Sequence, residues 1–466
     1  MARWAVFLAK AVPYVLTLLL VKGQGQEVKQ TSPFAGKPFV TVWNAPTQEC
    51  IRYSVVLDLE MFDIISSPNE GFYDQKLTIF YKERLGRYPY YSGQEPVNGG
   101  LPQNSSLLEH LDELEKDIKR YMRSSQMESL AVIDWEEWRP LWIRNWKSKQ
   151  IYRNKSRQLV SDKHPGWSES ELNREAQFEF EQSGQRFMIE TLRKARNTRP
   201  DSMWGFYLFP DCYNHDYKNN VENYTGQCPD VEISRNDLLM WLWRNSTAIF
   251  PSIYLDKTLR SSHSGKKFVR SRVKEAMRVS DLHSENYSLP VFVYSRPTYS
   301  YTVDLLTEQD LITTIGESAA LGAAGIIFWG DVDYSNSAGH CKTLDSYLEG
   351  DFGRYLLNVT TATQHCSRAL CGGNGRCERR VSDSDSYLHL DAGSFQIQGN
   401  NVTGGTKLLV TGALTKKDIR QFQDNFLCRC YRGWTGQRCN AKTSGAQLTV
   451  PRALTLVLTL LISAAI

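Results

Sequence analysis

The segment LAVIDWEEW, residues 130–138, joins a short apolar run to a cluster of carboxylates. Its first five residues have the length and apolar content of a buried strand. Comparable runs recur between long amphipathic segments, at residues 39–43, 77–81, 203–208, 249–254, 289–294 and 325–329. Strands that alternate with helices in this way predict an α/β fold, a (β/α) barrel. A doubly wound open sheet is the alternative, although no Gly-x-Gly-x-x-Gly follows the first strand.

Helix signals occupy the segments between the predicted strands. Residues 105–124 carry leucines at three- and four-residue spacing. Ser168 and Glu171 form a capping box at the start of a helix that extends to about residue 196. Thr307 and Asp310 open another, which ends near Gly322.

The composition is that of a globular chain with about two or three domains. Of the 466 residues, 41% are hydrophobic and 23% are charged, so a disordered or fibrous chain is excluded. The formal charge of +4 is too small to indicate a nucleic-acid-binding protein. The excess lies in residues 1–25 and at Arg452, so the rest of the chain is neutral.

Both chain ends resemble processing signals. Residues 1–25 have a basic start, an apolar run at 12–21 and small residues Gly23 and Gly25, which predict a cleaved signal peptide. Residues 441–466 combine small residues, a polar spacer and an apolar tail, which predict a GPI-attachment signal that is removed. A short tail-anchor helix is the alternative. We expect a protein on the extracellular face of the plasma membrane, reached by the secretory pathway.

Cysteines and glycosylation sequons agree with export. The ten cysteines are an even number, and they include no Cys-x-x-Cys pair, so we expect no zinc or other metal and no cofactor. We predict glycosylation at six sequons: Asn104, Asn154, Asn223, Asn286, Asn358 and Asn401. Asn245, in the apolar stretch 238–250, is left out.

The carboxylates that follow residue 133 predict acid–base chemistry. Side chains alternate along a strand, so Asp134 and Glu136 should share a face while Glu137 points away. Repulsion and desolvation should then keep one proton on the pair at mildly acidic pH, as general acid catalysis at a glycosidic oxygen requires. A solvated acidic loop is the alternative. Because ordinary glycosidase carboxylates stand on opposite sides of the sugar, this spacing suits a substrate that supplies its own nucleophile.

Three motifs resemble those of the animal and venom hyaluronidases, glycoside hydrolase family 56: IDWEEWRP at 133–140, WGFYLFPDCYN at 204–214 and GESAALGAAG at 316–325. The resemblance covers nearly the whole mature chain, and the anchor signal points to the type-2, cell-surface branch. It implies a distorted TIM-like barrel over residues 26–360. It also implies endohydrolysis of the β-1,4 bond between N-acetylglucosamine and glucuronate in hyaluronan.

The resemblance also implies roles for individual residues. Glu136 would be the proton donor and later the base, and Asp134 would orient the acetamido group as its oxygen attacks the anomeric carbon, through an oxazolinium-like intermediate and with retention. The implied substrate-binding residues are Tyr81, Tyr207, Asp211, Tyr254, Arg272 and Trp329. One departure concerns the residue after Tyr294, which is acidic in some relatives and is Ser295, followed by Arg296, here. It leaves the pH profile and strength of activity open.

The cysteine spacing after residue 365 is that of an EGF-like domain, here at 361–440, split by a polar insert at about 381–426. The EGF pattern implies the pairs Cys366–Cys377, Cys371–Cys428 and Cys430–Cys439, and the family resemblance implies Cys50–Cys341 and Cys212–Cys228. Two other functions stay open: a hyaluronan-binding adhesion receptor with weak catalysis, and a hydrolase directed to chondroitin.

Overall fold

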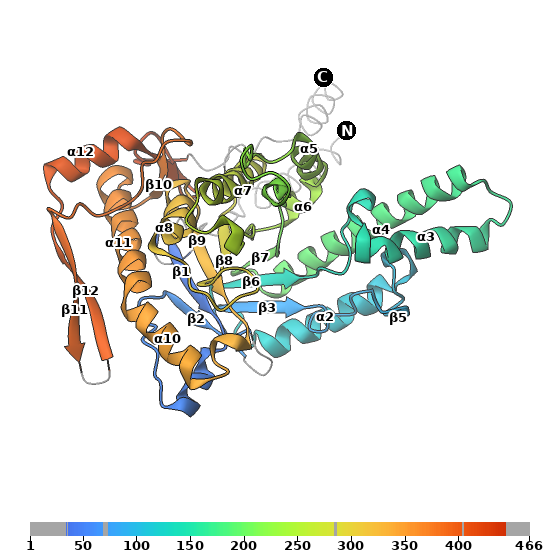
Figure 1. Cartoon of the computed structure of the whole chain (residues 1–466). Helices are drawn as coiled ribbons and strands as arrows, with labels where there is room; N and C mark the ends of the chain where they lie inside the picture. The colour runs from blue at the N-terminus through green and yellow to red at the C-terminus, as the bar shows by residue number, and fades with distance from the viewer. Residues whose placement is uncertain (1–33, 35, 69–72, 284–286, 403–404, 444–466) are drawn as a thin grey trace, which may run out of the picture.

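The computed structural model describes residues 34, 36–68, 73–283, 287–402 and 405–443 (Figure 1). The predicted signal peptide, Asn286 and all but the first three residues of the predicted anchor signal lie outside the described residues. Within the described part of the chain, none of the helices has both the length and the apolar character needed to cross a bilayer.

The core is a set of parallel strands in two sheets. One sheet has the order β2-β1-β9-β8, and the other has the order β3-β6-β7. The strands are β1 (Val40–Asn44), β2 (Ile64–Ser66), β3 (Leu77–Tyr81), β6 (Ser129–Asp134), β7 (Ser202–Phe206), β8 (Phe292–Ser295) and β9 (Gly325–Trp329). Six of them lie within or next to predicted strands. The strand β2 was not predicted from the sequence, since it is only three residues long.

The segment 249–254, predicted as a strand, is not a regular one. Its contacts with the neighbouring strands are isolated bridges, including Tyr207 with Phe250 and Ser252 with Tyr294. Pro251 has no N–H to donate to a ladder, which explains the irregularity. The segment nevertheless joins β7 to β8, because the Leu208 N–H donates to the Phe250 carbonyl at 2.9 Å and the Tyr294 N–H of β8 donates to the Pro251 carbonyl at 2.8 Å.

The barrel closes differently on its other side. No ladder joins β2 to β3 in the described residues; instead, the Leu77 N–H donates to the Ser66 hydroxyl at 3.2 Å. The barrel is therefore distorted, as expected. Its interior is filled by alternate strand residues such as Val42, Ile79 and Val132, and the intervening residues pack against the helices.

Helices surround the strands, and α3 and α4 form an antiparallel arm that extends from the barrel (Figure 1). The capping box of Ser168 and Glu171 is present at the start of α4, and the Thr307 hydroxyl accepts from the Asp310 N–H at the start of α8. The helices of the barrel are α2 (Leu107–Tyr121), α3 (Gln150–Lys163), α4 (Glu169–Thr198), α5 (Asp230–Leu238), α6 (Met240–Asn245), α7 (His263–Leu282), α8 (Glu308–Leu311), α9 (Glu317–Ala320) and α10 (Ala338–Glu349). A short hairpin of β4 (Tyr90–Ser92) and β5 (Glu95–Val97) lies between β3 and α2 in the chain.

A disulfide-rich region follows the barrel. The helix α11 (Asp351–Cys371) runs unbroken through the predicted boundary at residues 360 and 361. Beyond it, β10 (Gly375–Arg379) pairs with β13 (Phe426–Cys430). The insert between them forms a hairpin and a helix (Figure 1). Its elements are β11 (Phe395–Val402), β12 (Gly405–Gly412) and α12 (Lys416–Asn425), and β14 (Trp434–Thr435) and β15 (Ala441–Lys442) end the region.

The five disulfides have the pairing that the sequence analysis implied: Cys50–Cys341, Cys212–Cys228, Cys366–Cys377, Cys371–Cys428 and Cys430–Cys439. The first ties the segment after β1 to α10, and the second closes a short loop after β7. Such bonds persist in oxidising compartments, so this is a secreted, extracellular protein.

Candidate active site

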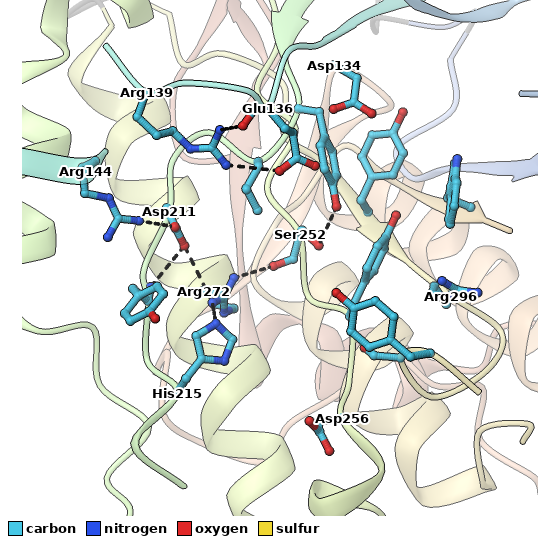
Figure 2. A pocket seen from close by; sticks show the side chains of 18 of the residues that line it. Asp134, Glu136, Arg139, Arg144, Asp211, His215, Ser252, Asp256, Arg272 and Arg296 are labelled. Atoms are coloured by element: carbon cyan, nitrogen blue, oxygen red, sulfur yellow. Dashed lines mark hydrogen bonds and ion pairs between the residues drawn. The ribbon is translucent and has the colours of Figure 1, made fainter. Parts of the chain in front are cut away.

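The carboxyl ends of the barrel strands surround a cavity of about 820 Å³ (Figure 2). The cavity brings together seven of the eight predicted site residues: Asp134, Glu136, Tyr207, Asp211, Tyr254, Arg272 and Trp329. The eighth, Tyr81, does not line the cavity but contacts a residue that does: its hydroxyl accepts from the indole N–H of Trp329 at 3.4 Å. Residues far apart in the sequence therefore meet because parallel strands end at the same level.

Asp134 is the last residue of β6, and its carboxyl group lies deep in the cavity. Burial and, to a smaller extent, the negative charge of Glu136 raise its pKa from 3.8 to about 7, against the opposing charge of Arg139. The Oδ1 atom is buried and has no hydrogen-bond partner in the described residues. This oxygen can therefore accept a hydrogen bond from a group that enters the cavity.

Glu136 lies nearer the solvent, with 47% of its side chain exposed. Its Oε2 atom is 3.2 Å from Nη2 of Arg139 (Figure 2). Glu137 does not line the cavity, and its carboxylate binds Nζ of Lys82 at 2.5 Å. The cavity therefore receives Asp134 and Glu136 but not Glu137, as strand alternation predicts.

Aromatic side chains form a second wall. The Tyr207 hydroxyl donates to Oγ of Ser252 at 3.3 Å, and the ring of Tyr254 is stacked on Trp329 with centroids 6.3 Å apart. Burial raises the pKa of Tyr207 and of Tyr254 far above 10, so both hydroxyls stay protonated. Two neutral hydroxyl groups therefore face the cavity, and that of Tyr207 is already bonded to Ser252.

Tyr294 also lines the cavity, although it was not predicted as a site residue. Its ring lies 5.0 Å from that of Tyr207, and its buried hydroxyl has no hydrogen-bond partner in the described residues. The only signal in the sequence was its place at the end of a predicted strand.

Asp211 lies on the opposite side of the cavity (Figure 2). It accepts from Arg144 at 2.6 Å and from the backbone N–H groups of Cys212 and Tyr213 at 2.8 and 3.1 Å. Burial would raise its pKa, but Arg272 and Arg144 lower it below 3.8. This carboxylate remains ionised.

Arg272 is buried beside Asp211, and each nitrogen of its guanidinium has a protein partner. It donates to Oδ1 of Asn214 at 2.9 Å and to the Ser252 carbonyl at 3.0 Å, and it contacts the His215 ring at 3.0 Å. Its Nη2 is 3.7 Å from Asp211. In this arrangement Arg272 supports the cavity wall as a buried cation.

Arginines that the sequence analysis did not place in the site also line the cavity: Arg139, Arg144 and Arg296. Arg296, noted only as a departure from some relatives, binds Asp331 at 2.8 Å and lies 5.2 Å from the ring centre of Trp329. Figure 2 shows it across the cavity from Arg144 and Asp211. Among the described residues, no group of His, Cys, Asp and Glu could hold a metal ion.

Comparison with known proteins shows the family of this chain. Residues 28–443 match the hyaluronidase family, glycoside hydrolase family 56. The chain belongs to this family. Among its relatives, human Hyaluronidase-2 is 52% identical over 91% of this chain and 90% of its own, and Hyaluronidase-1 of Bitis arietans is 48% identical over 87% and 91%. The protein is accordingly a hyaluronoglucosaminidase.

The hyaluronidase fold is also that of a solved relative. Bee venom hyaluronidase, in complex with a hyaluronic acid tetramer, has a TM-score of 0.61 and 30% identity, and the match covers 68% of this chain and 98% of that chain. The α/β fold is therefore the TIM-like barrel of that enzyme, followed here by the disulfide-rich region.

Proposed function

We propose that this hyaluronidase cleaves the β-1,4 bond between N-acetylglucosamine and glucuronate within hyaluronan, and that the substrate's own acetamido oxygen is the nucleophile. The supporting observation is the pair Asp134 and Glu136 on one wall of the cavity, where burial and repulsion raise the pKa of Asp134 to about 7. The pair thus keeps one proton at mildly acidic pH, as general acid catalysis requires.

The other cavity carboxylates favour substrate assistance. Each of those in the described residues is held in an ion pair: Asp211 with Arg144, Asp256 with Lys218, and Asp331 with Arg296. A protein nucleophile would have to be a free carboxylate on the opposite side of the sugar ring. Because Asp134 and Glu136 share one wall and the other cavity carboxylates neutralise cations of the protein, we assign that role to the acetamido oxygen.

The two carboxyl groups then have different roles: the buried Asp134 binds the acetamido group, and the more exposed Glu136 transfers the proton. The substrate N–H donates to the buried Oδ1 of Asp134, which favours the ionised form of that residue and leaves the shared proton on Glu136. Glu136 gives this proton to the glycosidic oxygen as the C1–O bond breaks and the acetamido oxygen bonds to C1. Water then attacks C1, Glu136 takes a proton from that water, and the acetamido group is released. Two inversions give retention of configuration.

The remaining predicted residues would shape the subsites. Tyr207 and Tyr254, whose hydroxyls stay protonated, would donate to the acetamido group and the sugar. Trp329, oriented by Tyr81, offers a flat apolar face on which a sugar ring can pack. Asp211 and Arg272 would maintain the facing wall.

Replacement of Glu136 by Gln tests the assignment. Because amide nitrogen cannot supply the proton, Glu136→Gln should lower kcat by about 10²- to 10⁴-fold while hyaluronan binding persists. The matched control is Glu137→Gln, which removes a neighbouring carboxylate that faces away from the cavity. Turnover of hyaluronan and of chondroitin would be measured over about pH 4 to 7.5.

The other outcomes of this assay are equally decisive. Equal rates for wild type and Glu136→Gln would contradict the role of Glu136. Binding without turnover by either protein would mark a hyaluronan receptor, and faster cleavage of chondroitin would mark a chondroitin-directed enzyme. A product whose first-formed anomer is inverted would contradict substrate assistance.

We further propose a GPI-anchored, glycosylated protein whose residues 361–440 form an EGF-like domain. The six cysteines of this region pair first with third, second with fourth and fifth with sixth, which supports the EGF-like domain. The apolar segment at 453–466 supports the anchor. Asn104, Asn154 and Asn223 are exposed, whereas Asn358 is half-buried and accepts from the Leu390 N–H at 2.9 Å. Release from cells by a phosphatidylinositol-specific phospholipase would test the anchor.

A further inference from the structure

Lys149 stands at the far end of the loop that carries Glu136. This loop begins after β6, contains two single 3-10 turns, Trp142–Arg144 and Lys147–Lys149, and returns to the cavity just before α3. Lys149 itself lines the cavity. The loop thus places a cation next to the peptide group of the residue that we assign as acid and base.

The contacts of Lys149 are with the main chain of the two glutamates. Its ammonium donates to the carbonyl oxygen of Glu136 and, at 3.4 Å, to that of Glu137. Arg139 donates to the same Glu136 carbonyl at 3.2 Å through Nη1, and to the Glu136 carboxylate at 3.2 Å through Nη2. Two cations therefore hold one peptide group.

The side chain of Glu136 depends on this support. It is about half exposed, and its one ion pair in the described residues is with Arg139. The main chain of Arg139 is held by another residue, the fully buried Asn145. The Asn145 side chain accepts from the main-chain N–H of Arg139 at 2.9 Å and donates to its main-chain carbonyl at 2.8 Å. Lys149 connects the far end of the loop to the peptide group of Glu136.

We propose that Lys149 is a positioning residue for Glu136: it fixes the peptide group that aims the carboxyl into the cavity, and its charge stabilises the carboxylate left after proton transfer. This inference rests on the proposed role of Glu136. Displacement of a catalytic group by about 1 Å can lower the rate by about 10²-fold. Loss of the contact between Lys149 and the Glu136 carbonyl should therefore lower kcat. The charge of Lys149 acts on the strength of the acid.

Several charged or titratable groups surround Glu136, and the test has to separate them. They are Asp134 at the end of β6, Arg139 and Lys149 from the loop, and Tyr207 beyond β7. Burial and the charge of Arg139 lower the pKa of Lys149 to about 8, against the charges of Glu136 and Glu137. The ammonium is therefore charged throughout the mildly acidic range in which the carboxyl pair titrates.

The kinetic experiment compares Lys149→Met, Lys149→Arg and the control Lys155→Met, which removes the same charge from α3 outside the cavity. Lys149→Met should lower kcat by about 10- to 100-fold with KM within about twofold. Its profile of kcat/KM against pH should shift to higher pH by about 0.5 to 1 pH unit. Lys149→Arg, which keeps the charge and donors, should restore most of kcat, and Lys155→Met should match wild type.

Two results would overturn the proposal: an unchanged kcat in Lys149→Met, or a fall in kcat with an unmoved pH profile and a lowered Tm, which a purely structural role predicts. A readout independent of turnover is the carboxyl-carbon NMR titration of Asp134 and Glu136. Lys149→Met should raise the apparent pKa values of the pair, and unchanged values refute the proposal. If wild type cleaves no hyaluronan, the proposed function fails, while this titration still decides the role of Lys149.

Discussion

The carboxyl group of Asp134 binds its proton more tightly than an exposed aspartate because burial, and then the charge of Glu136, disfavour ionisation. Its pKa of about 7 lies above the unfolded value of 3.8. Between these values the folded protein binds more protons than the unfolded chain. The stabilising contribution of Asp134 is therefore complete below about pH 4 and is lost as the pH rises through 7.

Replacement of Asp134 by Asn should remove this pH dependence, since the amide has the same shape and does not titrate. Between pH 4.5 and 7 we expect wild type to lose about 3 kcal/mol more of its free energy of unfolding than Asp134→Asn. Urea unfolding at both pH values measures the difference. Asp237→Asn, at an exposed ion pair with Arg278, is the control. Equal pH slopes in wild type and Asp134→Asn would contradict the raised pKa.

At the scale of elements, the cavity depends on how closely β7 approaches the irregular segment that follows α6. Gly205 lies in β7, and a Cβ atom built there would be 2.3 Å from the Ala248 carbonyl oxygen. A side chain is therefore excluded, and this glycine lets the segment that carries Ser252 and Tyr254 lie against β7.

Gly205→Ala should push this segment away and lower the free energy of unfolding by about 1–3 kcal/mol. Because Ser252 and Tyr254 would move with it, kcat should fall as well. Thermal unfolding and hyaluronan turnover are the measurements. Gly166→Ala, where a Cβ meets nothing within 4 Å, is the control and should be nearly neutral. Equal stabilities of the two variants would refute the packing argument.

At the scale of the whole molecule, the third family motif joins the barrel to the disulfide-rich region. Glu317 of α9 and Arg379 of β10 are both fully buried and are 2.7 Å apart. Glu317 also accepts from Arg270 of α7 at 2.6 Å and from the Tyr387 hydroxyl at 2.8 Å. This motif therefore has a structural role, away from the cavity.

Glu317→Gln should leave the fully buried Arg379 without a countercharge, and Arg270 with only the exposed Asp385, and destabilise the protein by about 3 kcal/mol. We expect a lower Tm and earlier proteolysis after α11, with the cavity chemistry retained below the Tm. Asp385→Asn removes an exposed partner of the same Arg270 and should cost less than about 1 kcal/mol. A Glu317→Gln protein as stable as Asp385→Asn would show that the two regions do not depend on this contact.

Local signals in the sequence predicted much of the fold, because they depend on neighbours along the chain. The strands at 77–81 and 325–329, the capping box at Ser168 and the EGF-type disulfide order at 366–439 agree with the structure, whereas the pair Cys50–Cys341 was implied only by the family resemblance. The strand at 249–254 was wrong as a regular element, since Pro251 interrupts it. The three residues of β2 were too few to show a pattern.

The sequence by itself determined the residue types of the site: a strand that ends in two carboxylates on one face, and polar or aromatic residues at the ends of other strands. Tertiary structure alone decided what those residues meet. It buried Asp134 beside Glu136, and it gave each nitrogen of the Arg272 guanidinium a protein partner. It also brought Tyr294, Arg139 and Lys149 to the cavity. The reason is physical: periodicity and spacing are local, whereas burial and charge, which set the pKa of Asp134, come from residues distant in the chain.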